Sequence, residues 1–84
     1  MRKGAKVKKV TIYSRSNCHL CEVALTTVMS FAPEFDFEIE RILIDGSARL
    51  EEKYGEQVPV ILIDGQVHDY FRVNPERFRK ALLS

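Results

Sequence analysis

The chain has 84 residues, 30% of them charged, and a formal net charge of +1 at pH 7. This length is enough for one compact domain and too short for two, so we expect a single domain over residues 1–84. The balanced charge does not favour a nucleic-acid partner, and no apolar stretch approaches the roughly 20 residues that span a bilayer. We expect a monomeric cytoplasmic protein without membrane contact, in which residues 1–6 form a flexible, basic start.

The first two predicted elements are a strand and a helix. Residues 7–13 contain β-formers and are followed by polar turn residues, which predicts a strand. Asn17 is a good helix cap, and apolar residues then recur at steps of three and four until Pro33. We predict a helix that begins at Cys18 and ends near Phe31.

A second strand and a short helix follow. Apolar and acidic residues alternate over 35–40, and the apolar phase then slips by one position at Arg41, before the apolar residues 42–44. This pattern predicts a strand with a bulge or an early end near Arg41. Residues 48–54 are predicted to form a helix of about two turns, for which Gly55 is a natural end.

The last elements are a hairpin and a helix. The apolar run 60–63 meets Asp64-Gly65, a dipeptide that favours a tight turn, and residues 67–71 can return antiparallel. A final helix has Pro75 in its first turn, with apolar residues on one side and basic residues on the other.

The order β-α-β-α-β-β-α predicts an α/β fold with a four-stranded mixed sheet and helices on both faces. A right-handed crossover through the first helix makes the first two strands parallel, and the hairpin makes the last two antiparallel. The end of the first strand and the start of the first helix then form an exposed edge, where a reactive group can meet solvent. Cys18 lies at this edge.

The only two cysteines, Cys18 and Cys21, are spaced so that one helical turn brings their sulfurs together. A disulfide across so short a loop removes little chain entropy from the unfolded state, so redox chemistry explains the pair better than stabilisation does. Unpaired N–H groups and positive dipole charge at a helix N-terminus favour a thiolate, which makes Cys18 the predicted nucleophile. We predict that Cys21, on the core-facing side of the helix, is the more buried, resolving thiol. The pattern therefore predicts a thiol-disulfide oxidoreductase.

Two other interpretations of the cysteine pair stay open. The main alternative is a binding or delivery module that carries a metal, or an iron–sulfur cluster shared between two chains. Further metal ligands would have to come from His19, His68 or carboxylates, because a second closely spaced ligand pair is absent from the sequence. The other alternative is a scaffold with two unreactive thiols. We expect no metal and no cofactor.

Four more residues are candidates for substrate binding. Arg15 precedes Cys18 by three positions, so it either holds a substrate carboxylate and stabilises the thiolate or is an exposed loop cation. His19 either stabilises the thiolate when protonated or is simply exposed. Pro59 starts an apolar strand and restricts Val58 to an extended conformation.

Three segments carry a family resemblance. The run Tyr13-Ser14-Arg15-Ser16-Asn17-Cys18-His19-Leu20-Cys21, the run Gln57-Val58-Pro59-Val60 and the turn Asp64-Gly65 resemble the glutaredoxins. They resemble more closely the small glutaredoxin-like proteins of the thioredoxin superfamily, over nearly the whole chain. One difference is that glutaredoxins usually carry a Gly-Gly followed by an acidic pair after the last strand, where this chain has Tyr70-Phe71-Arg72-Val73-Asn74.

The resemblance implies a thioredoxin-like fold in which the cysteine matching Cys18 is the nucleophile and the one matching Cys21 resolves. It implies that the proline matching Pro59 is cis and adjoins the cysteines, and that Arg15 and the Val58 backbone help to hold glutathione. The implied substrates are disulfide-containing proteins and glutathione mixed disulfides. The implied electron donor is glutathione or a thioredoxin-type reductase.

Overall fold

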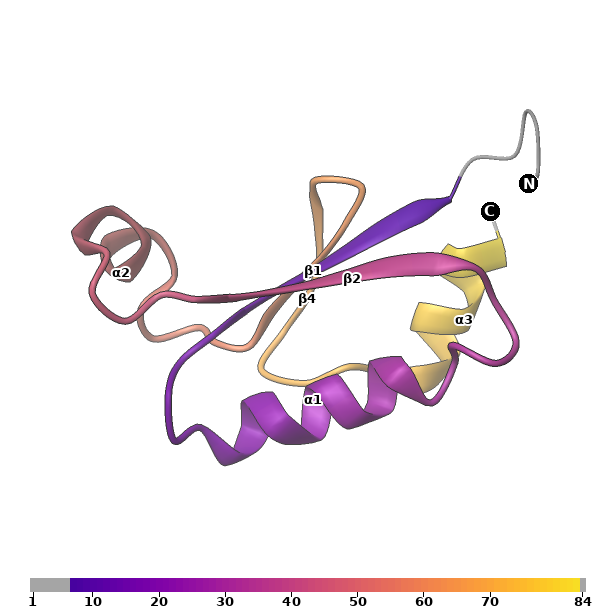
Figure 1. The fold of residues 1–84 in the computed structure, drawn as a ribbon, viewed down its shortest axis with the longest axis horizontal. Coiled ribbons are helices and arrows are strands. Elements are labelled where there is room, and N and C mark those ends of the chain that lie inside the picture. Colours follow the sequence, from indigo (N-terminus) through magenta and orange to yellow (C-terminus); the bar gives the residue numbers. More distant parts are fainter. Residues whose placement is uncertain (1–6, 84) are drawn as a thin grey trace.

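A computed structural model describes residues 7–83 of the chain (Figure 1). The predicted start at residues 1–6 lies outside this range. The elements follow in the predicted order: β1 (Lys8–Ser14), α1 (His19–Met29), β2 (Phe37–Leu43), α2 (Ala48–Tyr54), β3 (Val60–Ile63), β4 (Gln66–Tyr70) and α3 (Pro75–Leu83). Within residues 7–83, no helix is both long and apolar enough to cross a membrane.

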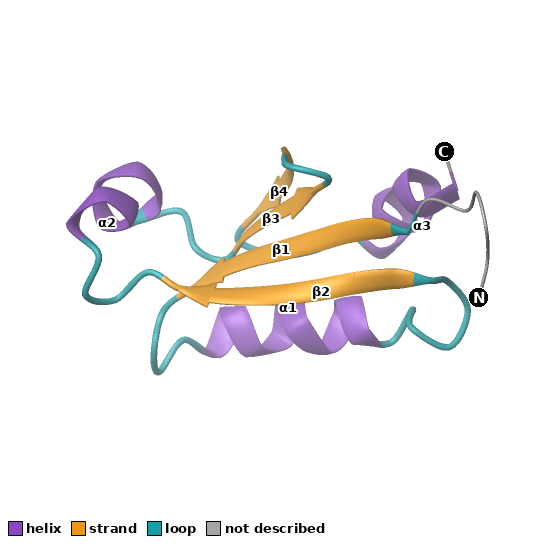
Figure 2. Cartoon of the chain, turned by 45° about the horizontal axis from the view of Figure 1, so that its top comes forward, coloured by secondary structure: helices purple, strands orange, loops and turns teal. Residues whose placement is uncertain are grey.

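The strands form one four-stranded mixed sheet in the order β2-β1-β3-β4 (Figure 2). β1 pairs parallel with β2 through the α1 crossover and antiparallel with β3. β3 and β4 form the predicted antiparallel hairpin, and Asp64 and Gly65 in its turn both have positive φ, at 51° and 84°. Gly at the second position of such a turn adopts this conformation without steric cost.

Helices cover both faces of the sheet, as predicted. Because side chains alternate along a strand, neighbouring residues of β1 and β3 pack into different clusters. The cluster against α1 and α3 contains Val10, Ile12, Ala24, Val28, Phe31, Ile61, Val73 and Phe78. The α2 cluster contains Ile44, Tyr54, Val60 and Leu62. Full burial of one such side chain stabilises the fold by roughly 1.5–3 kcal/mol relative to exposure.

The bulge predicted near Arg41 is wrong. β2 pairs with β1 without interruption, from Lys8 opposite Phe37 to Ser14 opposite Leu43. The apolar phase changes there because the covered face changes: Ile39 packs against the α1–α3 cluster, whereas Ile44, just beyond the strand, belongs to the α2 cluster. The irregular register lies instead between β3 and β4, at Ile61 and Leu62.

Candidate redox site at Cys18 and Cys21

Cys18 and Cys21 form a disulfide at the start of α1, with their Cα atoms 5.2 Å apart. Cys18 is half-buried, whereas Cys21 faces the core and is 1% exposed. The prediction that Cys21 is the more buried of the two is confirmed. The helix positions both residues, because successive turns of α1 carry Cys21, Ala24 and Val28 on its buried side.

Cys18 itself is the N-cap of α1, so the prediction that Asn17 caps the helix is wrong. The backbone of Cys18 is extended, and its Sγ accepts a hydrogen bond from the Cys21 amide at 3.1 Å. Asn17 has φ of 56°, a left-handed conformation that Asn tolerates, and it turns the chain from strand to helix. A cap whose acceptor is sulfur places that sulfur where N–H groups and the helix dipole favour negative charge.

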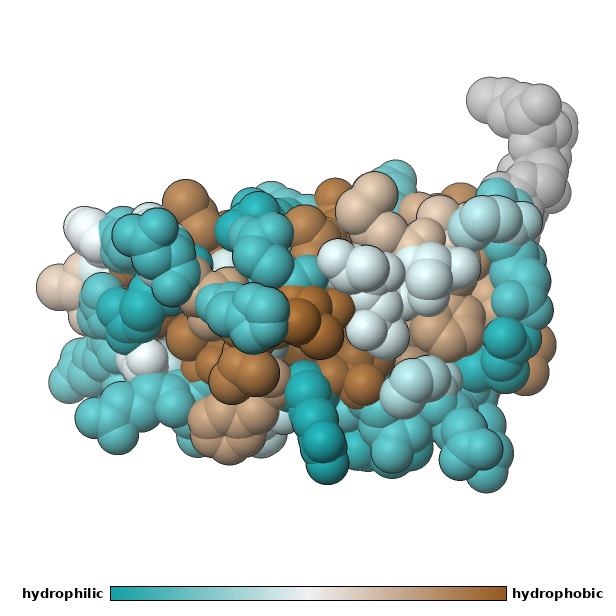
Figure 3. Space-filling view, turned by 90° about the horizontal axis from the view of Figure 1, so that it is seen from below, coloured by the Kyte–Doolittle hydropathy of each residue, from teal (hydrophilic) through white to brown (hydrophobic). Residues whose placement is uncertain are grey.

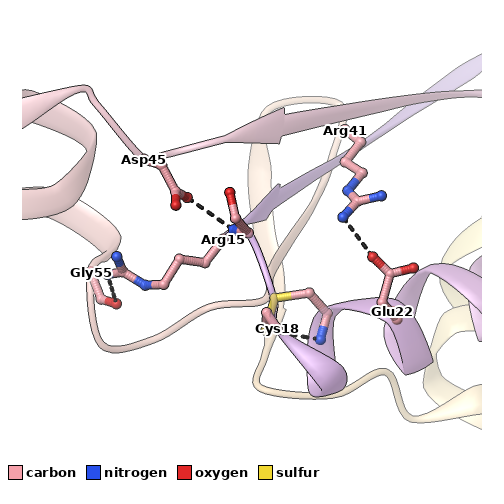
Figure 4. The surroundings of a disulfide bond; sticks show 8 residues. Arg15, Cys18, Glu22, Arg41, Asp45 and Gly55 are labelled. Carbon is pink, nitrogen blue, oxygen red and sulfur yellow. Dashed lines mark hydrogen bonds and ion pairs between the residues drawn. A yellow bond between two sulfur atoms is a disulfide. The ribbon is translucent and has the colours of Figure 1, made fainter.

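Arg15 is bound to α2 and is directed away from the disulfide (Figure 4). Its guanidinium donates to both carboxylate oxygens of Glu51, at 2.9 and 2.7 Å, and to the Gly55 carbonyl at 2.6 Å. The hydrogen bond with Glu51 raises the pKa of Arg15 further above its usual value. The side chain therefore anchors the loop before Cys18 to the end of α2, and a substrate carboxylate would compete with Glu51 for it.

Asp45 holds the same loop from the other side. Its Oδ1 accepts a hydrogen bond from the Ser16 amide at 3.0 Å, and this bond is the main cause that lowers the pKa of Asp45. One residue earlier, the Ile44 amide donates to the Ser14 carbonyl at 2.8 Å. Since parallel strands end at the same edge of a sheet, the segment after β2 lies beside the loop after β1.

Sequence reasoning missed Asp45 and Glu51 as partners of this loop. The available signal for Asp45 was its position: it is a carboxylate that comes shortly after β2, the strand that runs parallel to β1. For Glu51 no such signal exists, because its contact with Arg15 spans 36 positions and depends on how α2 packs. A third contact links Glu22, in the first turn of α1, to Arg41 of β2 at 2.7 Å (Figure 4).

The Val58–Pro59 peptide bond is cis, as the resemblance implied. Tyr13 pairs with Val60, so the antiparallel register brings Pro59 near Ser14, at the end of the sheet that carries the cysteines. Pro59 is fully buried, and its carbonyl accepts a hydrogen bond from the Phe71 amide at 2.7 Å.

Val58 and His19 differ in their surroundings. Val58 is half-buried against the α2 cluster, and within residues 7–83 its backbone N–H and C=O make no hydrogen bond. His19 is exposed as the first residue of α1. The structure thus brings Pro59, Cys18 and Cys21 to one end of the sheet and directs Arg15 toward α2.

Comparison with known proteins decides the family. The sequence matches the family described as Glutaredoxin-like domain (DUF836) over residues 9–83, which is most of the chain. The chain belongs to this glutaredoxin-like family. A similar relative is the uncharacterized protein Mb0520 of Mycobacterium bovis, which is 28% identical over 76 residues, covering 84% of this chain and 78% of the relative.

Solved structures agree with the family assignment. Protein Ne2328 of Nitrosomonas europaea superposes with a TM-score of 0.82 at 26% identity, covering 98% of this chain and 99% of that one. The thioredoxin of Fasciola hepatica superposes with a TM-score of 0.59 at 21% identity, covering 92% and 79%, and shows the fold alone. The chain is thus a glutaredoxin-like protein with a thioredoxin-like fold, and its Cys18–Cys21 pair supports a redox role.

Proposed function

We propose that this glutaredoxin-like protein is a thiol-disulfide oxidoreductase in which Cys18 is the nucleophile and Cys21 the resolving thiol. The hydrogen bond from the Cys21 amide to Cys18 Sγ carries the proposal, because the same N–H would stabilise a Cys18 thiolate in the reduced protein. The difference in burial supports the division of roles. A substrate can reach the half-buried Cys18, while Cys21 attacks from the core side.

The proposed reaction exchanges one disulfide for another. The Cys18 thiolate attacks a substrate disulfide, which forms a mixed disulfide and releases the first substrate thiolate. Cys21, as a thiolate, then attacks Cys18 Sγ, which forms the Cys18–Cys21 disulfide and releases the second substrate thiolate. Two electrons and two protons, from two molecules of glutathione or from a thioredoxin-type reductase, restore the dithiol.

We propose that the substrates are disulfides and glutathione mixed disulfides of proteins. The unpaired backbone of Val58, next to Pro59, is available to an extended segment of a partner. Hydrophobic side chains gather near the middle of the face that carries α1 (Figure 3), and Leu20 and Val23 on this helix are 52% and 45% exposed. Such a surface suits a polypeptide better than a small polar disulfide.

Arg15 and His19 complete the proposed site. Part of the Arg15 guanidinium is occupied by Glu51 and Gly55, so its remaining N–H groups are those proposed to meet a glutathione carboxylate. His19, exposed beside Cys18, is proposed to contact the substrate segment that flanks the attacked disulfide.

A reduction assay with a peptide–glutathione mixed disulfide tests the proposal. Cys18→Ser should abolish turnover, whereas Cys21→Ser should accumulate a covalent adduct at Cys18 that mass spectrometry detects. Ser30→Ala, at the far end of α1, is the matched control and should behave as wild type. Turnover by Cys18→Ser would refute the proposal, and visible absorbance of anaerobically purified protein would favour the cluster-carrying alternative.

A further inference from the structure

Ser14, the last residue of β1, is a buried polar residue that the proposed reaction has not used. Its side chain is 0% exposed. Its Oγ has no hydrogen-bond partner within the part of the chain that the structure describes. Because a buried hydroxyl without a partner is unfavourable, a residue of this kind at the edge of a redox site calls for an explanation.

The direction of β1 and α1 brings Ser14 toward Cys21. α1 runs in the opposite direction to β1, the strand that precedes it in the sequence (Figure 1). On the strand, Val10 and Ile12 face the helix, and alternation puts Ser14 on the same side. On the helix, Val28 and Ala24 belong to the same cluster, and Cys21 continues that row toward the N-terminus.

At the same end of the molecule, the row on β1 therefore finishes with the Ser14 hydroxyl, and the row on α1 finishes with the Cys21 sulfur. Along β1, Ser14 follows Val10 and Ile12 on the same side of the strand. Along α1, Cys21 lies one turn before Ala24 on the buried side of the helix. Pro59 follows the last pair of β1 and β3, Tyr13 with Val60, which brings it near Ser14, and it is itself fully buried. The alternation of β1 and the buried row of α1 thus place Ser14 and Cys21 at the same end of the two rows, below the edge that carries Cys18.

This placement has a chemical consequence during turnover. When the bond between Cys18 and Cys21 opens, Cys21 must ionise within the core before it can attack a mixed disulfide, and burial disfavours that negative charge. A hydroxyl without another partner can donate to this sulfur as soon as it is released.

We propose that Ser14 is a positioning residue that hydrogen-bonds Cys21 Sγ in the reduced protein and in the mixed disulfide. This inference rests on the proposed function and names a further residue of the same site. In the resolving step, Cys21 S⁻ attacks Cys18 Sγ, the Cys18–Cys21 bond forms, and the bond from Cys18 to the substrate sulfur breaks. The departing substrate thiolate takes up the proton that Cys21 gave up, and Ser14 keeps its own proton throughout.

The proposal predicts an effect that depends on the redox state. Ser14 is paired only when the disulfide is open, so Ser14→Ala should destabilise the reduced protein and slightly stabilise the oxidised one, in which it removes an unpaired hydroxyl. The equilibrium with glutathione should then shift toward the Cys18–Cys21 disulfide by about fivefold, the size expected for one hydrogen bond to a buried thiol that stays mostly protonated at rest. A residue needed only for packing would affect both states alike.

Two measurements test this. The first is the equilibrium of Ser14→Ala with glutathione redox buffers, for which Thr11→Val, a buried hydroxyl on the opposite face of β1, is the matched control and should cause no shift. The second is the midpoint of Cys21 thiolate formation in the Cys18→Ser background, which should rise when Ser14→Ala is added. Equal stability changes in both redox states, or an unchanged Cys21 midpoint, would overturn the proposal. The second measurement needs no turnover, so it remains decisive if the protein proves to have no oxidoreductase activity.

Discussion

Reducing the Cys18–Cys21 bond should leave the protein folded. The two residues are three positions apart in the sequence, and closing so short a loop stabilises a fold by roughly 2 kcal/mol in the chain-entropy model. Against this loss, a Cys18 thiolate at the N-terminus of α1 gains about 0.3–2 kcal/mol from the helix dipole and the unpaired N–H groups. The net difference between oxidised and reduced protein should therefore be below about 2 kcal/mol, because the two effects oppose each other.

Urea unfolding of both redox states measures this difference. With a slope of about 1–3 kcal/mol per M, the midpoints should differ by no more than about 2 M. The difference should also depend on pH. A thiol that ionises more readily in the folded state stabilises the reduced protein increasingly as the pH rises toward about 8.5, the pKa of a thiol in the unfolded chain. The reduced protein loses this stabilisation as the pH falls.

The gap between the two states should therefore narrow as the pH rises toward about 8.5. A variant with both Cys18→Ser and Cys21→Ser is the matched control, since it has no thiol to ionise and its stability should not rise in this way. Unfolding of the protein on reduction would refute the reasoning, because the disulfide would then be structural. A gap that does not change with pH would refute the claim that the helix N-terminus stabilises the Cys18 thiolate.

Three further predictions concern the groups around the site. Glu51→Ala frees the Arg15 guanidinium for a substrate carboxylate, so KM for a glutathione mixed disulfide should fall relative to Glu52→Ala. An unchanged KM would argue against Arg15 as a carboxylate-binding residue. The Ser16 amide lowers the pKa of Asp45, so its carboxylate contributes stability above about pH 4 that is lost as the pH falls further. Between about pH 6 and pH 3, the free energy of unfolding in urea should therefore fall less for Asp45→Asn than for wild type. An equal fall in both proteins would contradict this prediction. Phe78→Ala, at a 0% exposed position with an edge contact to Phe31, should cost about 3–5 kcal/mol in the same assay, and a loss below about 1 kcal/mol would mean that α3 is not held by this residue.

Much of the fold could be predicted because its signals are local. The Asp64-Gly65 turn and Pro75 each mark a boundary by their own backbone preferences. The slip at Arg41 was misjudged because alternation shows which residues share a side of a strand, but not which side a helix covers. Ile39 and Ile44 are both apolar because two different clusters cover β2 and the residue after it.

The site was predictable only in part, because some of its features depend on local spacing and others on contacts between distant parts of the chain. The spacing of Cys18 and Cys21 relative to the helix repeat determines their difference in burial, so sequence alone was enough for that. The partners of the preceding loop come from other parts of the chain. Asp45 lies 29 positions from Ser16, and the contact exists only because β2 runs parallel to β1 in this register.

These long-range contacts explain how Cys18 can stay in place when the bond between Cys18 and Cys21 opens, as the proposed reaction requires. Arg15 ties the loop to α2, Asp45 ties Ser16 to the segment after β2, and Ser14 continues β1. None of these contacts involves either sulfur, so opening the bond between Cys18 and Cys21 leaves them unchanged. The Cys21 amide is fixed by α1 in the same way, and it meets the Cys18 sulfur in the disulfide as it would meet the thiolate. The backbone and its neighbouring contacts therefore hold this N–H group in place before a Cys18 thiolate forms, which is the preorganisation that the proposed exchange reaction needs.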